Sequence, residues 1–253
     1  KKKNKFVEFD GFWSSSLTDS LLRGKPDNQS VDLNIRITAL SEILDITSKP
    51  IIFDADNGGR IEHLPFTINS MERQGISAIV LEDKVGLKKN SLFSNQVNAK
   101  QDTIKNFSKK ISVAVESRKS KDFLIVARIE SLILKNGMSD ALKRATAYSK
   151  AGADAILIHS KQKNPKEIFL FAKKFKKSKY YKPLIAVPSS YSKTFEKDLI
   201  KNDFKIVIYA NHVLRASYLA INNVLKSILE NERSFESEKN ISPISELLKY
   251  SLY

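Results

Sequence analysis

Short apolar runs that alternate with segments of helical periodicity constrain the fold of this chain most strongly. The runs have the length of buried strands, and the segments between them repeat apolar residues every three or four positions. Seven runs are expected to form strands, near residues 10, 52, 79, 126, 156, 185 and 207. Such strict alternation predicts a parallel sheet that is covered by helices.

The predicted helices fill the intervals between these strands. They span residues 31–47, 62–74, 97–117, 140–151, 165–177, 194–201 and 213–230, with a last helix over 242–252. A chain of 253 residues has the usual size of an α/β barrel, which closes with eight strands. We therefore predict a TIM-type (β/α)8 barrel over residues 1–232 with one βα unit missing, followed by a linker and helix over 233–253.

Lysine dominates the charge of the chain, which is +15 at neutral pH. A basic surface can indicate nucleic-acid binding, but base stacking would require exposed aromatic residues among the basic ones. In the lysine-rich stretch 173–177, Phe175 instead follows Phe171 at core-facing helical spacing. We expect solvated helix faces, no nucleic-acid partner, and a positive field that attracts an anionic substrate.

The composition also narrows the cellular context. The chain contains no cysteine, which excludes disulfides and thiolate metal sites. No apolar run approaches the roughly 18 residues of a membrane span, and no signal peptide is recognisable. We therefore expect a cytoplasmic protein with no membrane partner.

Polar side chains follow the carboxyl ends of most predicted strands. They are Ser15, Asp54, Asp56, Glu82, Arg128, Glu130, His159 and Asn211. The carboxyl ends of barrel strands lie on one face, where barrel enzymes have their active sites. Any one of these residues could be a helix cap or a loop residue, but their recurrence at successive strand ends indicates a site.

Three of these carboxylates, Asp54, Asp56 and Glu82, predict a site for a hard cation. Magnesium prefers oxygen ligands at about 2.0–2.1 Å and retains several waters. The absence of cysteine and the oxygen-only donor set argue against zinc. Mg²⁺ is therefore the predicted cofactor, and an acidic turn without metal is the alternative.

The residues after the third predicted strand carry the most specific motif. Glu82-Asp83-Lys84 is followed, after five residues, by Asn90-Ser91. This spacing resembles the signature of the phosphoenolpyruvate mutases, a branch of the isocitrate lyase superfamily. The resemblance extends from about Phe9 to the C-terminus. The isocitrate and methylisocitrate lyases are excluded because they use a catalytic cysteine, which this chain lacks.

The resemblance implies a magnesium-dependent interconversion of phosphoenolpyruvate and 3-phosphonopyruvate, the first step of phosphonate biosynthesis. It implies that Asp54 binds the metal directly and that Asp56 and Glu82 act mainly through water. The catalytic residues that it implies are Asp27, Lys88, Asn90, Arg128 and His159. The substrate-binding residues are Ser15, Ser16, Leu17, Asn90, Ser91, Arg128 and His159.

Several of these residues have a simpler interpretation. Asp27 is implied as a nucleophile or an electrostatic guide, but it could belong to a plain turn. Arg128 suits phosphoryl oxygens, but it could pair only with Glu130 or Glu82. His159 could donate to the phosphoryl or carboxylate group, or be a core histidine with a backbone partner.

The segment from Lys84 to Ala99 is predicted to be a lid. Gly86 would allow it to hinge, and Lys88 and Asn90 would enter the site when it closes. A solvated basic loop is the alternative.

Two other functions remain open. A leakier lid around the same residues would make a phosphonopyruvate hydrolase. Asn90 favours the mutase, because hydrolases tend to depart from asparagine at this position. A non-catalytic barrel that binds anions or nucleic acid is the lower-ranked alternative.

The resemblance also implies features beyond the site. In the family, a helix near the C-terminus is exchanged between subunits, which implies a homodimer or homotetramer. Family members also begin with one more βα unit, so we expect about thirty further residues to precede Lys1.

Overall fold

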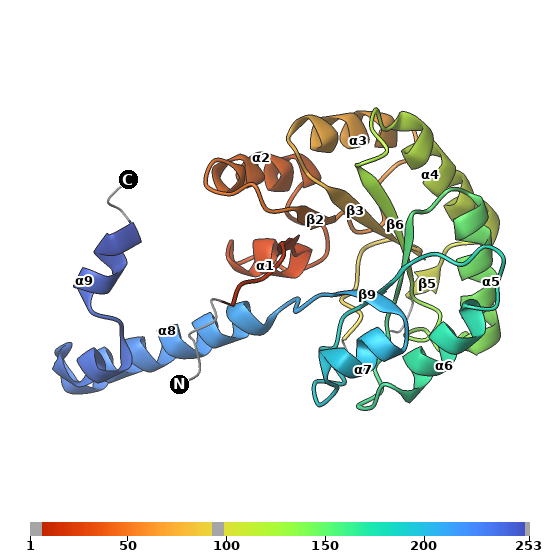
Figure 1. The fold of residues 1–253 in the computed structure, drawn as a ribbon. Coiled ribbons are helices and arrows are strands. Elements are labelled where there is room, and N and C mark those ends of the chain that lie inside the picture. The colour runs from red at the N-terminus through yellow and green to blue at the C-terminus, as the bar shows by residue number, and fades with distance from the viewer. Residues whose placement is uncertain (1–6, 93–98, 251–253) are drawn as a thin grey trace. The chain divides into compact units, whose positions relative to one another are not determined.

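The structure is a computed structural model, and it describes residues 7–92 and 99–250. One parallel sheet has the order β1-β2-β3-β6-β7-β8-β9. Its strands are β1 (Phe12–Ser14), β2 (Ile51–Asp54), β3 (Ala78–Glu82), β6 (Leu124–Ile129), β7 (Ala155–Ile158), β8 (Leu184–Ala186) and β9 (Phe204–Val207). Within the described ranges no pairing joins β1 to β9, so the curled sheet is open (Figure 1).

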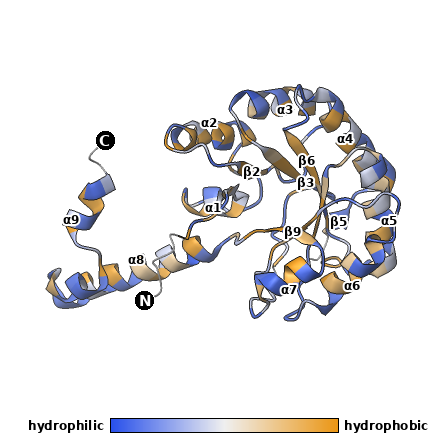
Figure 2. Cartoon of the chain, viewed as in Figure 1, coloured by the Kyte–Doolittle hydropathy of each residue, from blue (hydrophilic) through white to orange (hydrophobic). Residues whose placement is uncertain are grey.

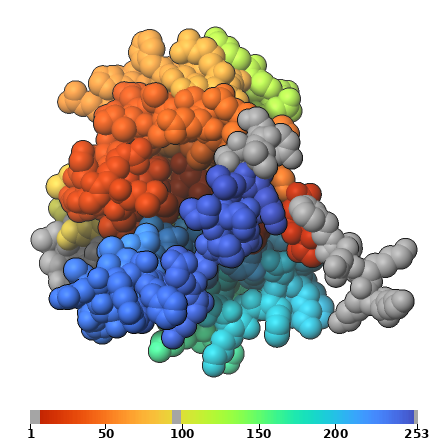
Figure 3. Space-filling view, turned by 90° about the vertical axis from the view of Figure 1, so that its left-hand side faces the viewer, coloured from red at the N-terminus to blue at the C-terminus, as the bar shows by residue number. Residues whose placement is uncertain are grey.

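Helices lie between these strands in the chain, and all but the first of them lie along the outer side of the curled sheet (Figure 1). They are α1 (Ser16–Leu21), α2 (Leu33–Leu44), α3 (Leu64–Arg73), α4 (Ile104–Ser117), α5 (Gly137–Lys150), α6 (Lys166–Phe175) and α7 (Glu196–Lys201). Figure 3 shows α2 in orange-red next to α3 in light orange on one face of this part of the chain. The predicted α/β architecture with seven strands is therefore confirmed.

The period-two geometry of the strands divides the core into two clusters. In β3, Ile79 and Leu81 belong to the larger cluster, which includes the buried side chains of the helices. Ala78 and Val80 belong to a smaller cluster formed by strand residues on the inner face of the sheet. Figure 2 shows the apolar colour of the strands between the mixed colours of the helices. Successive side chains of a strand point to opposite faces, so both faces of this sheet are buried.

Four local predictions were wrong. Residues 16–21, for which no helix was predicted, form α1, because the Oγ of Ser15 accepts a hydrogen bond from Thr18 N and caps it. The helix predicted from residue 97 begins at Ile104 after Thr103, whose Oγ1 accepts from Asn106 N. Residues 84–85 (β4) and 100–101 (β5) form an antiparallel pair that was not predicted. The terminal helix predicted over 242–252 is two short turns, α9 (Ile244–Leu247) and η2 (Leu248–Tyr250), and residues 251 and 252 lie outside the described part.

The chain divides into two compact units, residues 1–210 and 211–253. The second unit contains α8 (His212–Asn231), η1 (Phe235–Asn240), α9 and η2. No residue of α8 is buried, and its apolar side chains include the exposed Val213, Leu219 and Leu229. No helix in the described ranges is long and apolar enough to cross a membrane. The predicted boundary at residue 232 and the predicted helix exchange stay predictions.

Candidate active site

The polar residues after the strands lie along one edge of the sheet. Asp54 ends β2 and Glu82 ends β3, while Arg128 is the second-last residue of β6. The parallel register places Glu82 opposite Arg128. His159 directly follows β7 and is buried. The structure therefore brings these residues to the carboxyl edge of neighbouring strands, where a barrel fold places its chemistry.

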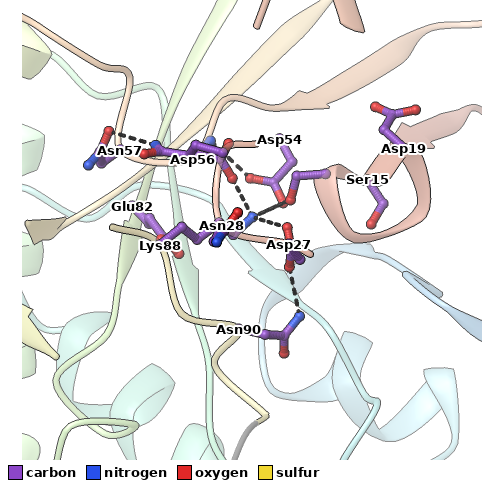
Figure 4. A network of polar contacts seen from close by, with 12 residues as sticks. Ser15, Asp19, Asp27, Asn28, Asp54, Asp56, Asn57, Glu82, Lys88 and Asn90 are labelled. Carbon is purple, nitrogen blue, oxygen red and sulfur yellow. Dashed lines mark hydrogen bonds and ion pairs between the residues drawn. The ribbon is translucent and has the colours of Figure 1, made fainter. Parts of the chain in front are cut away.

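Three aspartates surround the ammonium group of Lys88 (Figure 4). The Nζ of Lys88 lies 3.3 Å from Asp27 Oδ1 and 3.5 Å from Asp54 Oδ2, and it contacts Asp56 Oδ1. Ser16 Oγ also contacts this Nζ and donates to Asp54 Oδ2 at 3.1 Å. We call Asp27, Asp54, Asp56 and Lys88 the aspartate cluster. Lys88 is a buried ion-pair partner and not part of a solvated loop.

The charged groups in this cluster shift one another's pKa values. Burial would raise the pKa of Asp54, but the positive charges of Lys88, Arg128 and Arg36 outweigh it and lower that pKa well below its usual value. Burial raises the pKa of Asp56, and the nearby Asp54 adds to this rise. Burial would lower the pKa of Lys88, but the surrounding carboxylates raise it. The Lys88 side chain is therefore an ammonium ion and Asp54 a carboxylate at neutral pH.

Arg36 is a member of the site that sequence reasoning missed. It is 1% exposed, donates to Asp19 Oδ2 at 2.8 Å, and lies 3.6 Å from Asp56 Oδ2. Its guanidinium also lies 4.4 Å from the ring centroid of Phe53. Arg36 is three residues after Leu33 and four before Leu40, so the helical period places it on the inner face of α2. That spacing could have identified it.

Two glutamates form a second group beside the first. Lys84 Nζ lies 3.6 Å from Glu82 Oε2 and 3.3 Å from Glu130 Oε2. Arg128 donates through Nε to Glu130 Oε1 at 2.7 Å, and its Nη2 lies 3.5 Å from Glu82 Oε2. Ser91 Oγ donates to Glu130 at 2.5 Å and accepts from Arg128 at 2.6 Å. We call Glu82, Glu130, Lys84 and Arg128 the glutamate cluster.

The two glutamates of this cluster have opposite pKa shifts. Burial raises the pKa of Glu82 to about 7, although Arg128 and Lys84 partly oppose the rise. Burial would also raise the pKa of Glu130, but Arg128 and Lys84 lower it to about 2. Glu130 is therefore the permanent counter-ion of Arg128, and Glu82 is the group that exchanges protons near neutral pH.

His159 and Asn90 are the remaining predicted polar residues near these clusters. Burial and the positive charge of Arg128 lower the pKa of His159 to about 4, so its imidazole is neutral at physiological pH. Its Nδ1 is buried with no hydrogen-bond partner among residues 7–92 and 99–250. Asn90 Nδ2 donates to Asp27 Oδ2 at 3.0 Å. A neutral histidine can donate a hydrogen bond to a bound anion from the ring nitrogen that carries its proton.

The predicted carboxylate-binding segment lies on the same edge. Ser15 is the N-terminal cap of α1, Ser16 is buried against Asp54, and Leu17 is half-buried. The predicted lid is described only in part, because residues 93–98 lie outside the described ranges. Lys88, Asn90 and Ser91 precede that gap, and each contacts one of the two clusters.

Comparison with known proteins gives the family. A family model described as phosphoenolpyruvate phosphomutase matches residues 3–229. The chain belongs to this family. It is 34% identical to the phosphoenolpyruvate phosphomutase of Tetrahymena pyriformis over 244 residues, which cover 95% of this chain and 79% of the relative. It is also 34% identical to the phosphonopyruvate hydrolase of Variovorax sp. (strain Pal2) over 245 residues, which cover 95% and 82%.

Solved structures of the family agree with this fold. The phosphoenolpyruvate phosphomutase from Streptomyces platensis subsp. rosaceus superposes with a TM-score of 0.90 at 30% identity, covering 96% of this chain and 83% of that one. A phosphonopyruvate hydrolase in complex with oxalate and Mg²⁺ superposes with a TM-score of 0.86 at 33% identity, with the same coverage. The chain is thus a member of an enzyme family whose similar members include both mutases and hydrolases.

Proposed function

We propose that this chain is a phosphoenolpyruvate mutase that interconverts phosphoenolpyruvate and 3-phosphonopyruvate. The observation that carries the proposal is the hydrogen bond from Asn90 to Asp27, at 3.0 Å, beside the buried Lys88. The resemblance associates asparagine at this position with the mutases. The contact brings this residue from the segment after β3 to the aspartate implied in phosphoryl transfer.

In the forward reaction the P–O bond of phosphoenolpyruvate breaks and a P–C bond forms at its methylene carbon, with no atom lost. Phosphoryl transfer of this kind depends mainly on positioning and charge stabilisation. Arg128, His159 and Asn90 would hold the phosphoryl group, and Ser15, Ser16 and Leu17 the carboxylate. Asp27 would receive or steer the phosphoryl group.

Magnesium fits the residues that are present. Asp54 and Asp56 supply the carboxylate oxygens that this ion prefers, and ligands beyond these can be waters. Among the described residues no three His, Cys, Asp or Glu side chains converge in a metal-holding arrangement, because Lys88 lies between the aspartates and Glu82 is paired with Lys84 and Arg128. When bound, Mg²⁺ would stabilise the enolate and carboxylate oxygens of the pyruvate moiety.

Water is the competing acceptor of the phosphoryl group, so its exclusion separates a mutase from a hydrolase. The side chains of Lys88 and Asp27 are each 4% exposed. Phosphonopyruvate hydrolase is the second candidate, because a hydrolase relative has the same 34% identity as the mutase relative.

Phosphorus NMR of phosphonopyruvate with Mg²⁺ and enzyme tests the proposal. We expect a phosphoenolpyruvate resonance to grow at the expense of phosphonopyruvate. Inorganic phosphate as the only product would replace the mutase by the hydrolase, and no turnover of either kind would support the non-catalytic alternative.

Self-association through residues 211–253 is part of the proposal. The apolar side chains on α8 are a surface of the kind that monomers rarely expose. Light scattering should give a multiple of the 28.6 kDa chain mass. The double substitution Leu219→Glu, Leu229→Glu should lower the measured mass of the assembly towards that of a single chain. A monomeric wild type would contradict helix exchange.

A further inference from the structure

Asp83 has a buried carboxylate that the proposed chemistry does not use. It follows Glu82, but strand alternation turns it away from the inner face and toward α5. It is 0% exposed, yet it accepts hydrogen bonds from four different donors. These are Glu130 N at 2.9 Å, Gln101 Nε2 at 2.8 Å, Tyr148 Oη at 2.8 Å and Arg144 Nη1 at 3.2 Å.

These donors come from elements that border the site. Gln101 is in β5, Glu130 directly follows β6, and Tyr148 and Arg144 are in α5. The backbone of Asp83 adds two further bonds, because its N–H donates to Arg128 O at 3.1 Å and its C=O accepts from Asp102 N at 2.8 Å. One residue thus joins both ends of the segment that carries Lys88, Asn90 and Ser91 to the strand that carries Arg128.

The strand pair at the base of this segment is short, and further bonds from Gln101 to Ser131 and from Asn136 to Gln101 support it. β4 and β5 are two residues each, and an isolated two-stranded pair is marginally stable in water. A hydrogen bond to a charged, buried acceptor is stronger than one between neutral groups. The bond from Gln101 to Asp83 therefore contributes strongly to holding the second strand of the pair in register with the first.

We propose that Asp83 is a positioning residue that fixes β4, β5 and the backbone of Glu130 relative to one another. It thereby sets where Lys88, Asn90 and Ser91 meet the aspartate and glutamate clusters. This inference rests on the proposed mutase function, because the distinction between mutase and hydrolase depends on that placement. Asp83 itself touches no reacting atom in this scheme.

The test compares variants that cut different bonds of the same network. Asp83→Asn replaces one acceptor oxygen by a donor. Gln101→Leu removes the bond from β5 to Asp83, together with the bonds of Gln101 to Ser131 and Asn136. Tyr148→Phe removes a bond to the same carboxylate from α5, and Asn136→Ala removes the 2.7 Å bond that Asn136 donates to Gln101. The last two are matched controls, because they leave the link between Asp83 and β5 intact.

Hydrogen exchange by mass spectrometry is the first readout, because it does not depend on turnover. We expect peptides covering residues 84–92 to exchange about tenfold faster in Asp83→Asn and Gln101→Leu, and at the wild-type rate in both controls. Unchanged exchange in Gln101→Leu, or equal acceleration in Tyr148→Phe, would overturn the proposal. If Asp83→Asn does not fold, Gln101→Leu still decides.

Product partition by phosphorus NMR is the second readout. In Gln101→Leu we expect kcat to fall about tenfold with KM little changed, and the share of inorganic phosphate to rise. A wild-type enzyme that yields only phosphate would refute the mutase assignment, while the exchange result would still report on Asp83. An unchanged kcat and product ratio in Gln101→Leu would refute the positioning role in catalysis.

Discussion

The aspartate and glutamate clusters lie on the same edge of one sheet but differ in charge balance. In the glutamate cluster, Glu82 and Glu130 face the two cations Lys84 and Arg128. Around Lys88, the described carboxylates outnumber the cations. Asp19, Asp27, Asp54 and Asp56 share three cations, Arg23, Arg36 and Lys88.

This difference separates two roles, metal binding and the placement of anionic groups. In the sequence the residues of both clusters appear alike, as polar residues after successive strands. Buried carboxylates in excess of their counter-ions favour the binding of a further cation. A balanced cluster has no such excess, and it instead holds its arginine in a fixed orientation. We therefore assign metal binding to the aspartates, and placement of the anionic groups to Arg128.

The largest expected effect is on Asp54. Asp54→Ala should lower magnesium-dependent turnover about a thousandfold, because the excess negative charge of the aspartate cluster is reduced at its centre. The matched control is Asp19→Ala, whose carboxylate pairs with Arg36 but not with Lys88, and which should retain most of the activity. Steady-state kinetics measures the turnover of both variants, and circular dichroism checks that both are folded. Equal losses of turnover in the two variants would show that Asp54 is no more important for the reaction than Asp19.

The next effect concerns how the free energy of unfolding changes with pH, and it depends on the buried His159 beside the glutamate cluster. Its pKa of about 4 lies below the ordinary 6.5, so the unfolded chain takes up the proton first as the pH falls. Between pH 6.5 and pH 4, wild type should lose up to roughly 3 kcal/mol of unfolding free energy relative to His159→Asn. Urea titrations at several pH values measure this, and parallel curves for the two proteins would contradict the shift.

Arg128→Lys should lower kcat/KM about a hundredfold while the Mg²⁺ affinity stays near that of wild type. Lysine keeps the charge balance of the glutamate cluster but loses the planar fork that suits phosphoryl oxygens. Kinetics and calorimetric titration with Mg²⁺ separate the two effects. A large drop in Mg²⁺ affinity would show that the glutamate cluster also contributes to metal binding.

The smallest effect concerns Lys88. Lys88→Met should bind Mg²⁺ about tenfold more tightly in calorimetric titration, because an ammonium group no longer competes for the three aspartates. Lys84→Met is the matched control, since it removes a lysine from the balanced cluster. If both substitutions raise the affinity equally, the response would reflect net charge and not the position of Lys88.

Sequence patterns predicted the strands better than the elements between them. Apolar runs gave the seven strands, and the polar residues at their ends gave the edge of the site. The same patterns missed α1 and the β4–β5 pair, because a serine cap and a two-residue ladder have no periodicity. The apolar spacing around Arg36 indicates its burial, but neither that spacing nor the position of Asp83 after β3 identifies the distant residues with which these two pair.

Local sequence was sufficient to specify the α/β alternation, the family signature and which residue types reach the carboxyl edge. These features follow from local periodicity and spacing, which the chain carries without reference to distant residues. Which cation pairs with which carboxylate is defined by the folded chain and could not be inferred from spacing. Lys84 and Lys88 are four positions apart in one motif, yet one faces glutamates and the other aspartates. That partition depends on strand register and burial, which bring residues from separate βα units within a few ångströms of each other.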